Sequence, residues 1–122
     1  MLSTHIYLNG QTRAALHVYE KAFEAIVQKI IEDPGQSGLI IHAEIIIHDQ
    51  LLMLNDTGGD LDGCKSGGYQ LSVQFDNEAS LQKAYSVLKE GAHILFPLQA
   101  TDYSDHVVRL IDRFDVRWGL WV

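Results

Sequence analysis

The chain has 122 residues, 47% of them hydrophobic and 20% charged, a composition typical of one globular domain with a proper core. Its formal net charge of −7, without a cluster of lysine and arginine, argues against binding to nucleic acid phosphates. No apolar run is long enough to span a bilayer, and the first ten residues lack the pattern of a signal peptide. We therefore expect a cytoplasmic protein that binds neither nucleic acid nor a membrane.

The first predicted elements are a strand and a helix. Polar and apolar residues alternate over residues 3–9, which predicts a half-buried strand that Gly10 ends. Residues 11–23 have the apolar spacing of a helix that packs one face on a sheet. Thr12 is the expected N-cap of this helix.

Three further strands follow in the first half. Residues 25–32 are rich in β-branched side chains and predict a strand, which a turn with proline and glycine ends at 33–38. Residues 39–56 predict two apolar strands joined by a tight turn near residues 48–50. The order is therefore strand, helix, strand, strand, strand.

The second half repeats this order. A glycine-rich linker over 58–68 joins two predicted modules, about 1–57 and 68–122. The predicted elements of the second module are a strand over 69–75, a helix over 78–90 that Asp76 or Asn77 caps and Gly91 ends, a short strand over 93–96 that ends at Pro97, a loop over 101–106, and two strands over 107–111 and 117–122 joined by a turn over 112–116.

Local spacing also matches between the halves, because Leu16 follows Ile6 by ten residues and Leu81 follows Leu71 by ten. Two copies of this length do not make a solenoid. We expect a single α+β domain in which two βαβββ modules form a curled mixed sheet around a central cup. The helices would lie outside, and the polar faces of the strands would line the cup.

Three segments carry a resemblance to a known superfamily: YLNGQTRAALHVYEKAF at 7–23, HAEIIIHDQLLMLND at 42–56, and EGAHILFPLQATDYSDHVVRLIDRFDVRWGL at 90–120. They resemble the PhnB-like branch of the vicinal oxygen chelate superfamily, which includes glyoxalases, bleomycin-resistance proteins and extradiol dioxygenases. The chain departs from that branch at 103–105, where Trp-Gly-Asp is usual, and at 112–115, where Asp-Pro-Phe-Gly is usual.

The resemblance implies where a metal site would lie. Metal-using members take ligands from the first strand of each module and a carboxylate from the last, a donor set that suits Zn²⁺, Ni²⁺, Mn²⁺ or Fe²⁺. The first-strand positions here are His5 and Gln70, and the final carboxylate position falls at Gly119. We therefore predict no metal. A divalent metal held by His5, His42 and Glu44 is the alternative.

His42 and Glu44 are two residues apart, so in a strand they share a face. One interpretation is a His–carboxylate pair that binds a polar ligand or moves a proton; the other is a mutual hydrogen bond that closes the inner face of the sheet. Tyr103 lies on a loop that is either a lid or a solvated turn. The candidates for lining the cup are His5, Tyr7, His42, Glu44, Gln70, Tyr103 and Trp118.

The resemblance leaves two functions open. The first is a metal-free protein that binds a small molecule in the cup, similar to the bleomycin-resistance type. The alternative is a metal-dependent, glyoxalase-like lyase, isomerase or dioxygenase. The resemblance also implies a homodimer. Cys64 is the single cysteine, which excludes an internal disulfide, and we interpret it as a passive thiol.

Overall fold

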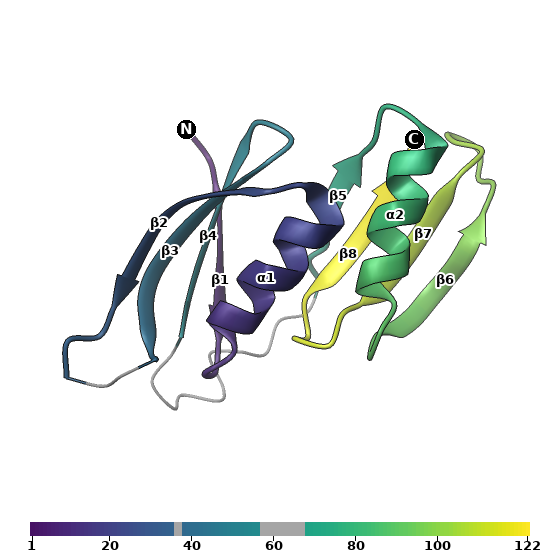
Figure 1. Cartoon of the computed structure of the whole chain (residues 1–122). Helices are drawn as coiled ribbons and strands as arrows, with labels where there is room; N and C mark the ends of the chain where they lie inside the picture. Colours follow the sequence, from purple (N-terminus) through teal and green to yellow (C-terminus); the bar gives the residue numbers. More distant parts are fainter. Residues whose placement is uncertain (36–37, 57–67) are drawn as a thin grey trace. The chain divides into compact units, whose positions relative to one another are not determined.

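A computed structural model of the chain describes residues 1–35, 38–56 and 68–122. The chain divides into two compact units, Met1–Lys65 (unit 1) and Ser66–Val122 (unit 2). The predicted linker over 58–68, with Cys64, lies outside the described residues except for Gly68. Each unit has one helix and a four-stranded mixed sheet, as the α+β prediction requires (Figure 1).

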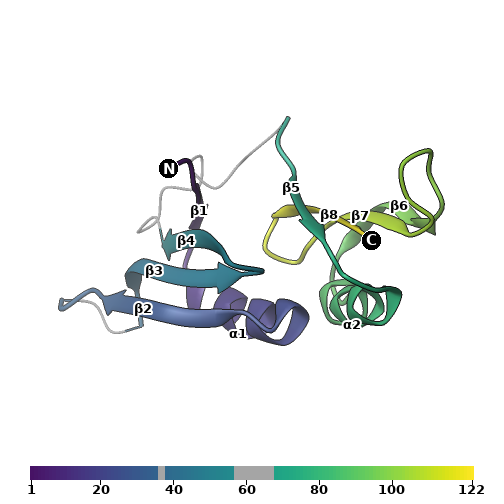
Figure 2. The same cartoon turned by 90° about the horizontal axis from the view of Figure 1, so that it is seen from above.

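Unit 1 contains the five predicted elements: β1 (Thr4–Leu8), α1 (Thr12–Phe23), β2 (Ile26–Glu32), β3 (Ile40–Ile47) and β4 (Gln50–Asp56). Its strands lie in the order β1-β4-β3-β2; β1 runs parallel to β4, and the other neighbours are antiparallel. Helix α1 packs along one face of this sheet (Figure 2). His48 and Asp49 both have positive φ, the conformation of a two-residue hairpin turn, so the predicted turn is confirmed.

The N-terminus of α1 differs from the prediction. Gln11 occupies the N-cap position, and Thr12 is the first residue of the helix and fully buried. The Asp56 carboxylate accepts hydrogen bonds from the Thr12 amide (3.1 Å) and hydroxyl (2.7 Å) through Oδ1, and from the Ile40 amide (3.0 Å) through Oδ2. A carboxylate from β4 thus does what a side-chain cap would do, because the first amides of a helix need acceptors.

Unit 2 has the same topology. Its elements are β5 (Leu71–Gln74), α2 (Glu78–Leu88), β6 (His93–Gln99), β7 (Val107–Ile111) and β8 (Arg117–Trp121). The strand order is β5-β8-β7-β6, with β5 parallel to β8. Asn77 caps α2, as one of the two predicted caps, by accepting a hydrogen bond from the Ser80 amide (2.9 Å). The helix ends two residues earlier than predicted, and Gly91, at φ +71°, turns the chain towards β6.

Strand β6 runs through Pro97, although the sequence predicted that proline would end it. The strand lies at the edge of its sheet and its pairing with β7 is irregular between Phe96 and Gln99. Proline is tolerated on edge strands and at bulges, because no ladder hydrogen bond is needed from its nitrogen there.

The turn between β7 and β8 is organised by Asp112, which is 4% exposed. Its Oδ1 accepts hydrogen bonds from the amides of Phe114 (2.8 Å) and Val116 (3.0 Å), and its Oδ2 accepts one from the indole nitrogen of Trp118 (2.8 Å). The Asp115 amide donates to the Asp112 carbonyl (3.0 Å), which closes the turn. The predicted turn over 112–116 is therefore confirmed.

Asp115 has φ +66°, at the position where the PhnB-like pattern has glycine. An L-residue in this conformation is strained, whereas glycine is not. We expect Asp115→Gly to raise the free energy of unfolding by about 0.5 to 1 kcal/mol. Urea denaturation measures the change, and Asp115→Ala should instead be destabilised. Equal stability of the two variants would contradict this explanation.

No helix in the described part of the chain is long and apolar enough to cross a membrane.

Candidate functional site

The face of the unit 1 sheet turned away from α1 carries the polar side chains that the sequence singled out. We call it the open face of unit 1, and it is formed by His5, Tyr7, His42, Glu44, Met53 and Asn55. The opposite face is buried, because Leu8, Ala43, Ile45, Leu52 and Leu54 are all at most 5% exposed. Strand alternation therefore places four of the predicted site residues on one surface.

On β1 and β4 the polar groups of this face bind one another. The ring of His5 stacks on that of Tyr7, with centroids 4.7 Å apart and planes 10° apart. His5 Nε2 is 2.5 Å from the side-chain carbonyl oxygen of Asn55, which accepts its hydrogen bond. The His42 ring meets the His5 ring edge-on at 5.9 Å. The sequence prediction included these residues except Asn55, whose position opposite β1 depends on the strand pairing.

His42 and Glu44 form the hydrogen bond that the second interpretation required, with His42 Nε2 2.7 Å from Glu44 Oε2. Both side chains remain about a quarter exposed, at 27% and 25%. The hydrogen bond from His42 lowers the pKa of the Glu44 carboxyl below its ordinary value of 4.5; partial desolvation opposes this, and the charge of Lys29 adds to it. The pair is therefore formed and accessible from solvent, which leaves a ligand-binding role open.

The lowered pKa of Glu44 predicts a pH dependence of stability. A carboxyl whose pKa is depressed by folding stabilises the native state above its unfolded value, here about 4.5, and loses that contribution as the pH falls through the folded value. In Glu44→Gln we expect this part of the acid destabilisation below pH 4.5 to disappear. Urea denaturation from pH 7 to pH 3 measures it, with Asp49→Asn in the exposed hairpin turn as the control. Parallel pH profiles for wild type and Glu44→Gln would refute the assignment.

The strand pairings within each unit show which residues of the two units are equivalent. Tyr7 pairs with Asn55 across β1 and β4, and Ser72 pairs with Gly119 across β5 and β8. Because Ser72 is the repeat equivalent of Tyr7, Gly119 takes the place of Asn55. Gln70 lies two residues before Ser72, as His5 lies two residues before Tyr7, so Gln70 takes the place of His5.

The neighbouring strands extend this alignment. In unit 1 Ala43 pairs with Leu54, so His42 lies one position along the antiparallel strand, opposite Asn55. In unit 2 Arg109 pairs with Gly119. Arg109 therefore corresponds to His42, and one module carries an imidazole where the other carries a guanidinium.

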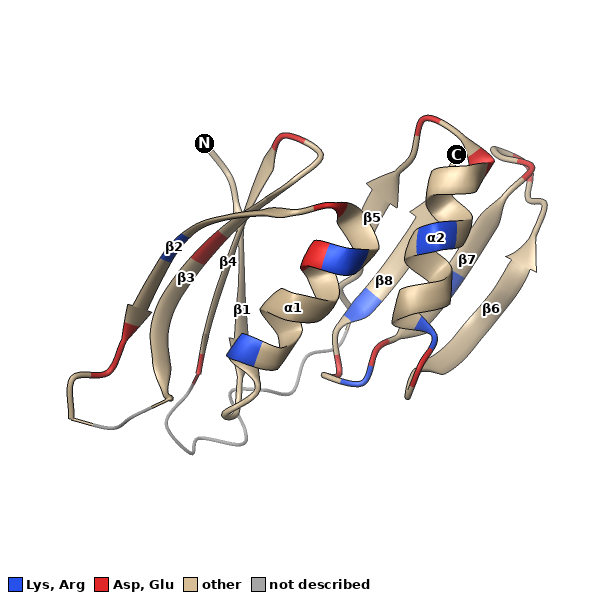
Figure 3. Cartoon of the chain, viewed as in Figure 1, with Lys and Arg blue, Asp and Glu red and all other residues tan. Residues whose placement is uncertain are grey.

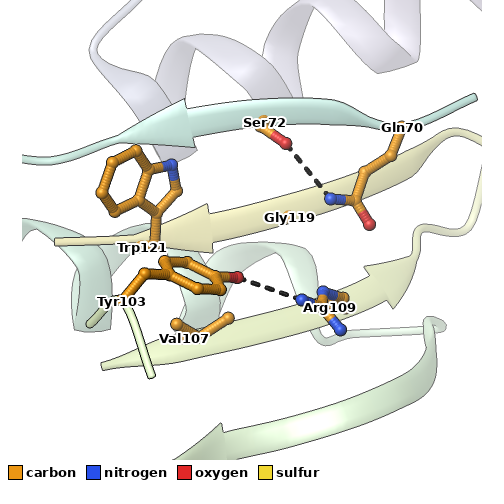
Figure 4. A pocket seen from close by; sticks show the side chains of 7 residues that line it. All are labelled: Gln70, Ser72, Tyr103, Val107, Arg109, Gly119 and Trp121. Carbon is orange, nitrogen blue, oxygen red and sulfur yellow. Dashed lines mark hydrogen bonds between the residues drawn. The ribbon is translucent and has the colours of Figure 1, made fainter. Parts of the chain in front are cut away.

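Unit 2 has a hollow of about 290 Å³ on the face of its sheet turned away from α2 (Figure 4). We call it the unit 2 pocket. It is lined by the polar side chains of Gln70, Ser72 and Arg109, the aromatic rings of Tyr103 and Trp121, and Val107 and Gly119. Gln70 and Tyr103 were predicted to be site residues, and the pocket brings them together.

Gly119 allows the Gln70 side chain to lie across β8. A Cβ atom at position 119 would stand 2.3 Å from Gln70 Nε2 and 2.9 Å from its Cδ, closer than atoms can approach. The amide of Gln70 donates a hydrogen bond to the Ser72 hydroxyl (3.1 Å), as Figure 4 shows. The position at which the superfamily places its final carboxylate is thus covered by a neutral amide.

Arg109 and two aromatic rings form the other side of the pocket. Arg109 Nη2 donates to the Tyr103 hydroxyl (3.0 Å), and the guanidinium lies 5.2 Å from the centre of the Phe96 ring. The Tyr103 ring meets the Trp121 ring edge-on, with centroids 5.8 Å apart (Figure 4). Tyr103 is therefore held against the pocket by both its ring and its hydroxyl.

Trp118 is not a pocket residue, which corrects the sequence prediction. It is 1% exposed and its indole nitrogen is bonded to Asp112, whereas Trp121 lines the pocket. The two tryptophans are three residues apart in a strand and face opposite sides. A signal for the right choice was present, because Trp121 is two residues from Gly119 and shares its face. Sequence reasoning also missed Arg109 and Ser72.

The superfamily-type metal positions do not fit a metal in this chain. They hold His5, Asn55, Gln70 and Gly119, which supply one imidazole, two neutral amides and no carboxylate. Hard and borderline divalent metals favour imidazole and carboxylate ligands. Within residues 1–35, 38–56 and 68–122, no three His, Cys, Asp or Glu side chains are grouped so that they could hold a metal ion.

Acidic and basic residues are mixed over both units, and acidic ones are frequent in the turns (Figure 3). The pocket departs from this pattern, because among the described residues that line it none is acidic and Arg109 alone carries a formal charge. Although the chain has a net charge of −7, Arg109 makes the pocket locally positive, so the pocket attracts anions.

Solved structures place this fold in a known class. The chain matches the PhnB protein from Bacillus cereus with a TM-score of 0.88 and 23% identity, covering 98% of this chain and 97% of that one. It matches a glyoxalase/bleomycin resistance protein/dioxygenase family enzyme from Burkholderia phytofirmans with a TM-score of 0.71 and 16% identity, covering 97% and 94%. The chain therefore has the same fold as these PhnB and glyoxalase/bleomycin-resistance/dioxygenase proteins, the fold that its sequence resemblance implied.

A closer sequence relative is an uncharacterized protein from Mycobacterium bovis, which is 30% identical over 128 residues, covering 98% of this chain and 80% of the relative. The chain belongs to one family with this mycobacterial protein. No protein-family model matches the chain.

Proposed function

We propose that this protein binds a small molecule without a metal, as a binding protein rather than a metal-dependent enzyme. The observation that carries the proposal is the unit 2 pocket, where two aromatic rings, an arginine, an amide and a hydroxyl converge. Apolar rings with a few placed polar groups are the usual composition of a ligand site. The donor set at the superfamily's metal positions supports the metal-free form of the proposal.

The open face of unit 1 is a second proposed binding surface. Its candidates are the residues predicted from sequence: His5, Tyr7, His42 and Glu44. The hydrogen bond between His42 and Glu44 and the stacking of His5 on Tyr7 support this role, because they hold the polar groups in place before a ligand arrives.

Thermal-shift screening with a broad library of small molecules tests the proposal. A ligand that binds the native state raises the melting temperature by mass action. Metal analysis of untagged protein is the companion measurement. The proposal fails if no compound stabilises the protein, or if the purified protein carries stoichiometric Zn²⁺, Ni²⁺, Mn²⁺ or Fe²⁺. The second result would favour a metal-dependent lyase, isomerase or dioxygenase.

Two structural expectations are also part of the proposal. We expect the two modules to form a single domain, so calorimetry should show one cooperative transition. We expect a homodimer, and light scattering that gives the mass of one 13.7 kDa chain would contradict it.

A further inference from the structure

We infer that the unit 2 pocket takes an aromatic carboxylate: a small anion whose acid group binds Arg109 and whose flat ring packs against Trp121 and Tyr103. This inference rests on the proposed function and adds the chemical class of the ligand. Four features of the pocket carry it.

The first feature is the state of Arg109. The residue is half-buried, and the partners of its guanidinium are a neutral phenol and an aromatic face. Within the described residues, no carboxylate forms an ion pair with it. A guanidinium has five N–H donors in a planar fork that fits a carboxylate, and one of these donors is bound to Tyr103. The guanidinium therefore has free N–H donors that an anion could accept from.

The second feature is the difference between the two modules. In unit 1 the equivalent residue, His42, is paired with Glu44, and His5 is bonded to Asn55. In unit 2 the residue on β7 is an arginine and the residue on β8 is Gly119. Arg109 thus takes the place of His42 and Gly119 takes the place of Asn55, and a hollow lies beside the cation.

The third feature is the set of neutral donors around Arg109. The Ser72 hydroxyl accepts from Gln70 Nε2, so its own proton is available to a ligand oxygen. None of the described residues that line the pocket is a carboxylate that would repel an anion. Hydrogen bonds from both a cation and a neutral donor make carboxylate binding stronger and more directional than charge alone.

The fourth feature is the aromatic wall. Trp121 and Tyr103 stand edge to face, which leaves ring surface turned into the pocket (Figure 4). The volume of about 290 Å³ is just below the range for small-molecule sites, roughly 300 to 1,000 Å³. The ligand is thus a compact ring with one acid group rather than an extended molecule.

Titration calorimetry with 2-naphthoate tests the inference. The comparison compounds are 2-naphthamide, which lacks the charge, 2-naphthylmethylamine, which reverses it, and cyclohexanecarboxylate, which keeps the charge and loses the aromatic ring. We expect 2-naphthoate to bind at least about tenfold more tightly than each of these. Equal or tighter binding of the amide or the amine would overturn the assignment of an anionic ligand.

Variants locate the binding. Arg109→Gln should weaken 2-naphthoate binding by about tenfold or more, and Arg109→Lys should recover part of the loss, because it restores the charge without the fork. Arg117→Gln is the matched control: Arg117 is exposed, is on the adjacent strand and does not line the pocket, so its affinity should equal that of wild type. Equal losses in Arg109→Gln and Arg117→Gln would overturn the inference.

Gly119→Ala provides a second variant that leaves Arg109 in place. Its methyl group would displace the Gln70 amide, which is the end of a flexible side chain, into the hollow. We expect weaker 2-naphthoate binding with an unchanged circular dichroism spectrum, and undiminished affinity would contradict the location. The experiments distinguish a failure of the anionic-ligand inference from a failure of the proposed function. A library hit that binds independently of Arg109 overturns the anionic ligand alone, whereas a library without any hit overturns the proposed function.

Discussion

Replacing Asp112 with asparagine is expected to lower the free energy of unfolding by about 3 kcal/mol. The Asp112 carboxylate is 4% exposed and accepts three hydrogen bonds, two from backbone amides of its own turn and one from Trp118. An asparagine keeps the shape but must turn its NH₂ group towards at least one of these donors. A buried donor without an acceptor costs about 1 to 3 kcal/mol, and the turn that joins β7 to β8 is disturbed as well.

Urea denaturation followed by tryptophan fluorescence measures this effect. Asp115→Asn is the matched control, because it removes the same charge from the same turn at an exposed position and keeps a residue that tolerates positive φ. Trp118→Phe should lose part of the same energy, and in a double-mutant cycle the two losses should be less than additive. If Asp112→Asn is as stable as Asp115→Asn, the carboxylate does not organise the turn.

Replacing Asp56 with alanine is expected to lower the free energy of unfolding by about 3 kcal/mol. Asp56 is 6% exposed and joins three elements of unit 1: it ends β4, and it accepts hydrogen bonds from the first residue of α1 and the first residue of β3. Alanine leaves these donors without their acceptor. The start of the helix also loses the negative charge that its dipole favours.

Graded variants separate the parts of this effect. Thr12→Val removes the buried hydroxyl but keeps the amide, so it should cost about 1 kcal/mol. Asp49→Asn changes the same charge in the exposed turn of the same unit and should change stability by less than about 0.5 kcal/mol. Chemical denaturation measures all three variants. A loss in Asp56→Ala no larger than that in Thr12→Val would show that the two backbone hydrogen bonds contribute little.

Several features of the fold follow from local sequence patterns. The predicted strands over 3–9 and 69–75 correspond to β1 and β5, and the predicted helices over 11–23 and 78–90 correspond to α1 and α2. Two predictions failed where a partner outside the segment decided the outcome. The prediction that Thr12 caps α1 was wrong because the acceptor at the start of the helix is Asp56, which β4 supplies. Strand β6 continues through Pro97 because it lies at a sheet edge.

The candidate site was predicted in part. His42 and Glu44 could be placed on one face from their spacing alone, and the structure shows that they form a hydrogen bond. Gln70 was identified through the internal repeat. Trp121 was missed although it shares a face with Gly119, and the burial of Trp118 with its bond to Asp112 shows which tryptophan belongs to the core. Arg109 was missed because an arginine in a strand is usually a solvated surface residue.

The sequence by itself determined the order of the elements, the duplication of the module and the absence of a carboxylate at residue 119, because these depend on periodicity and residue identity along the chain. Only the tertiary structure decided that Gln70 lies over Gly119, that Asp56 and Asp112 are buried acceptors, and that Arg109 meets Tyr103 beside a hollow. The physical reason is that each of these contacts joins different strands or loops. Strand register and loop conformation set their distances, and neither is encoded in the spacing of residues within one segment.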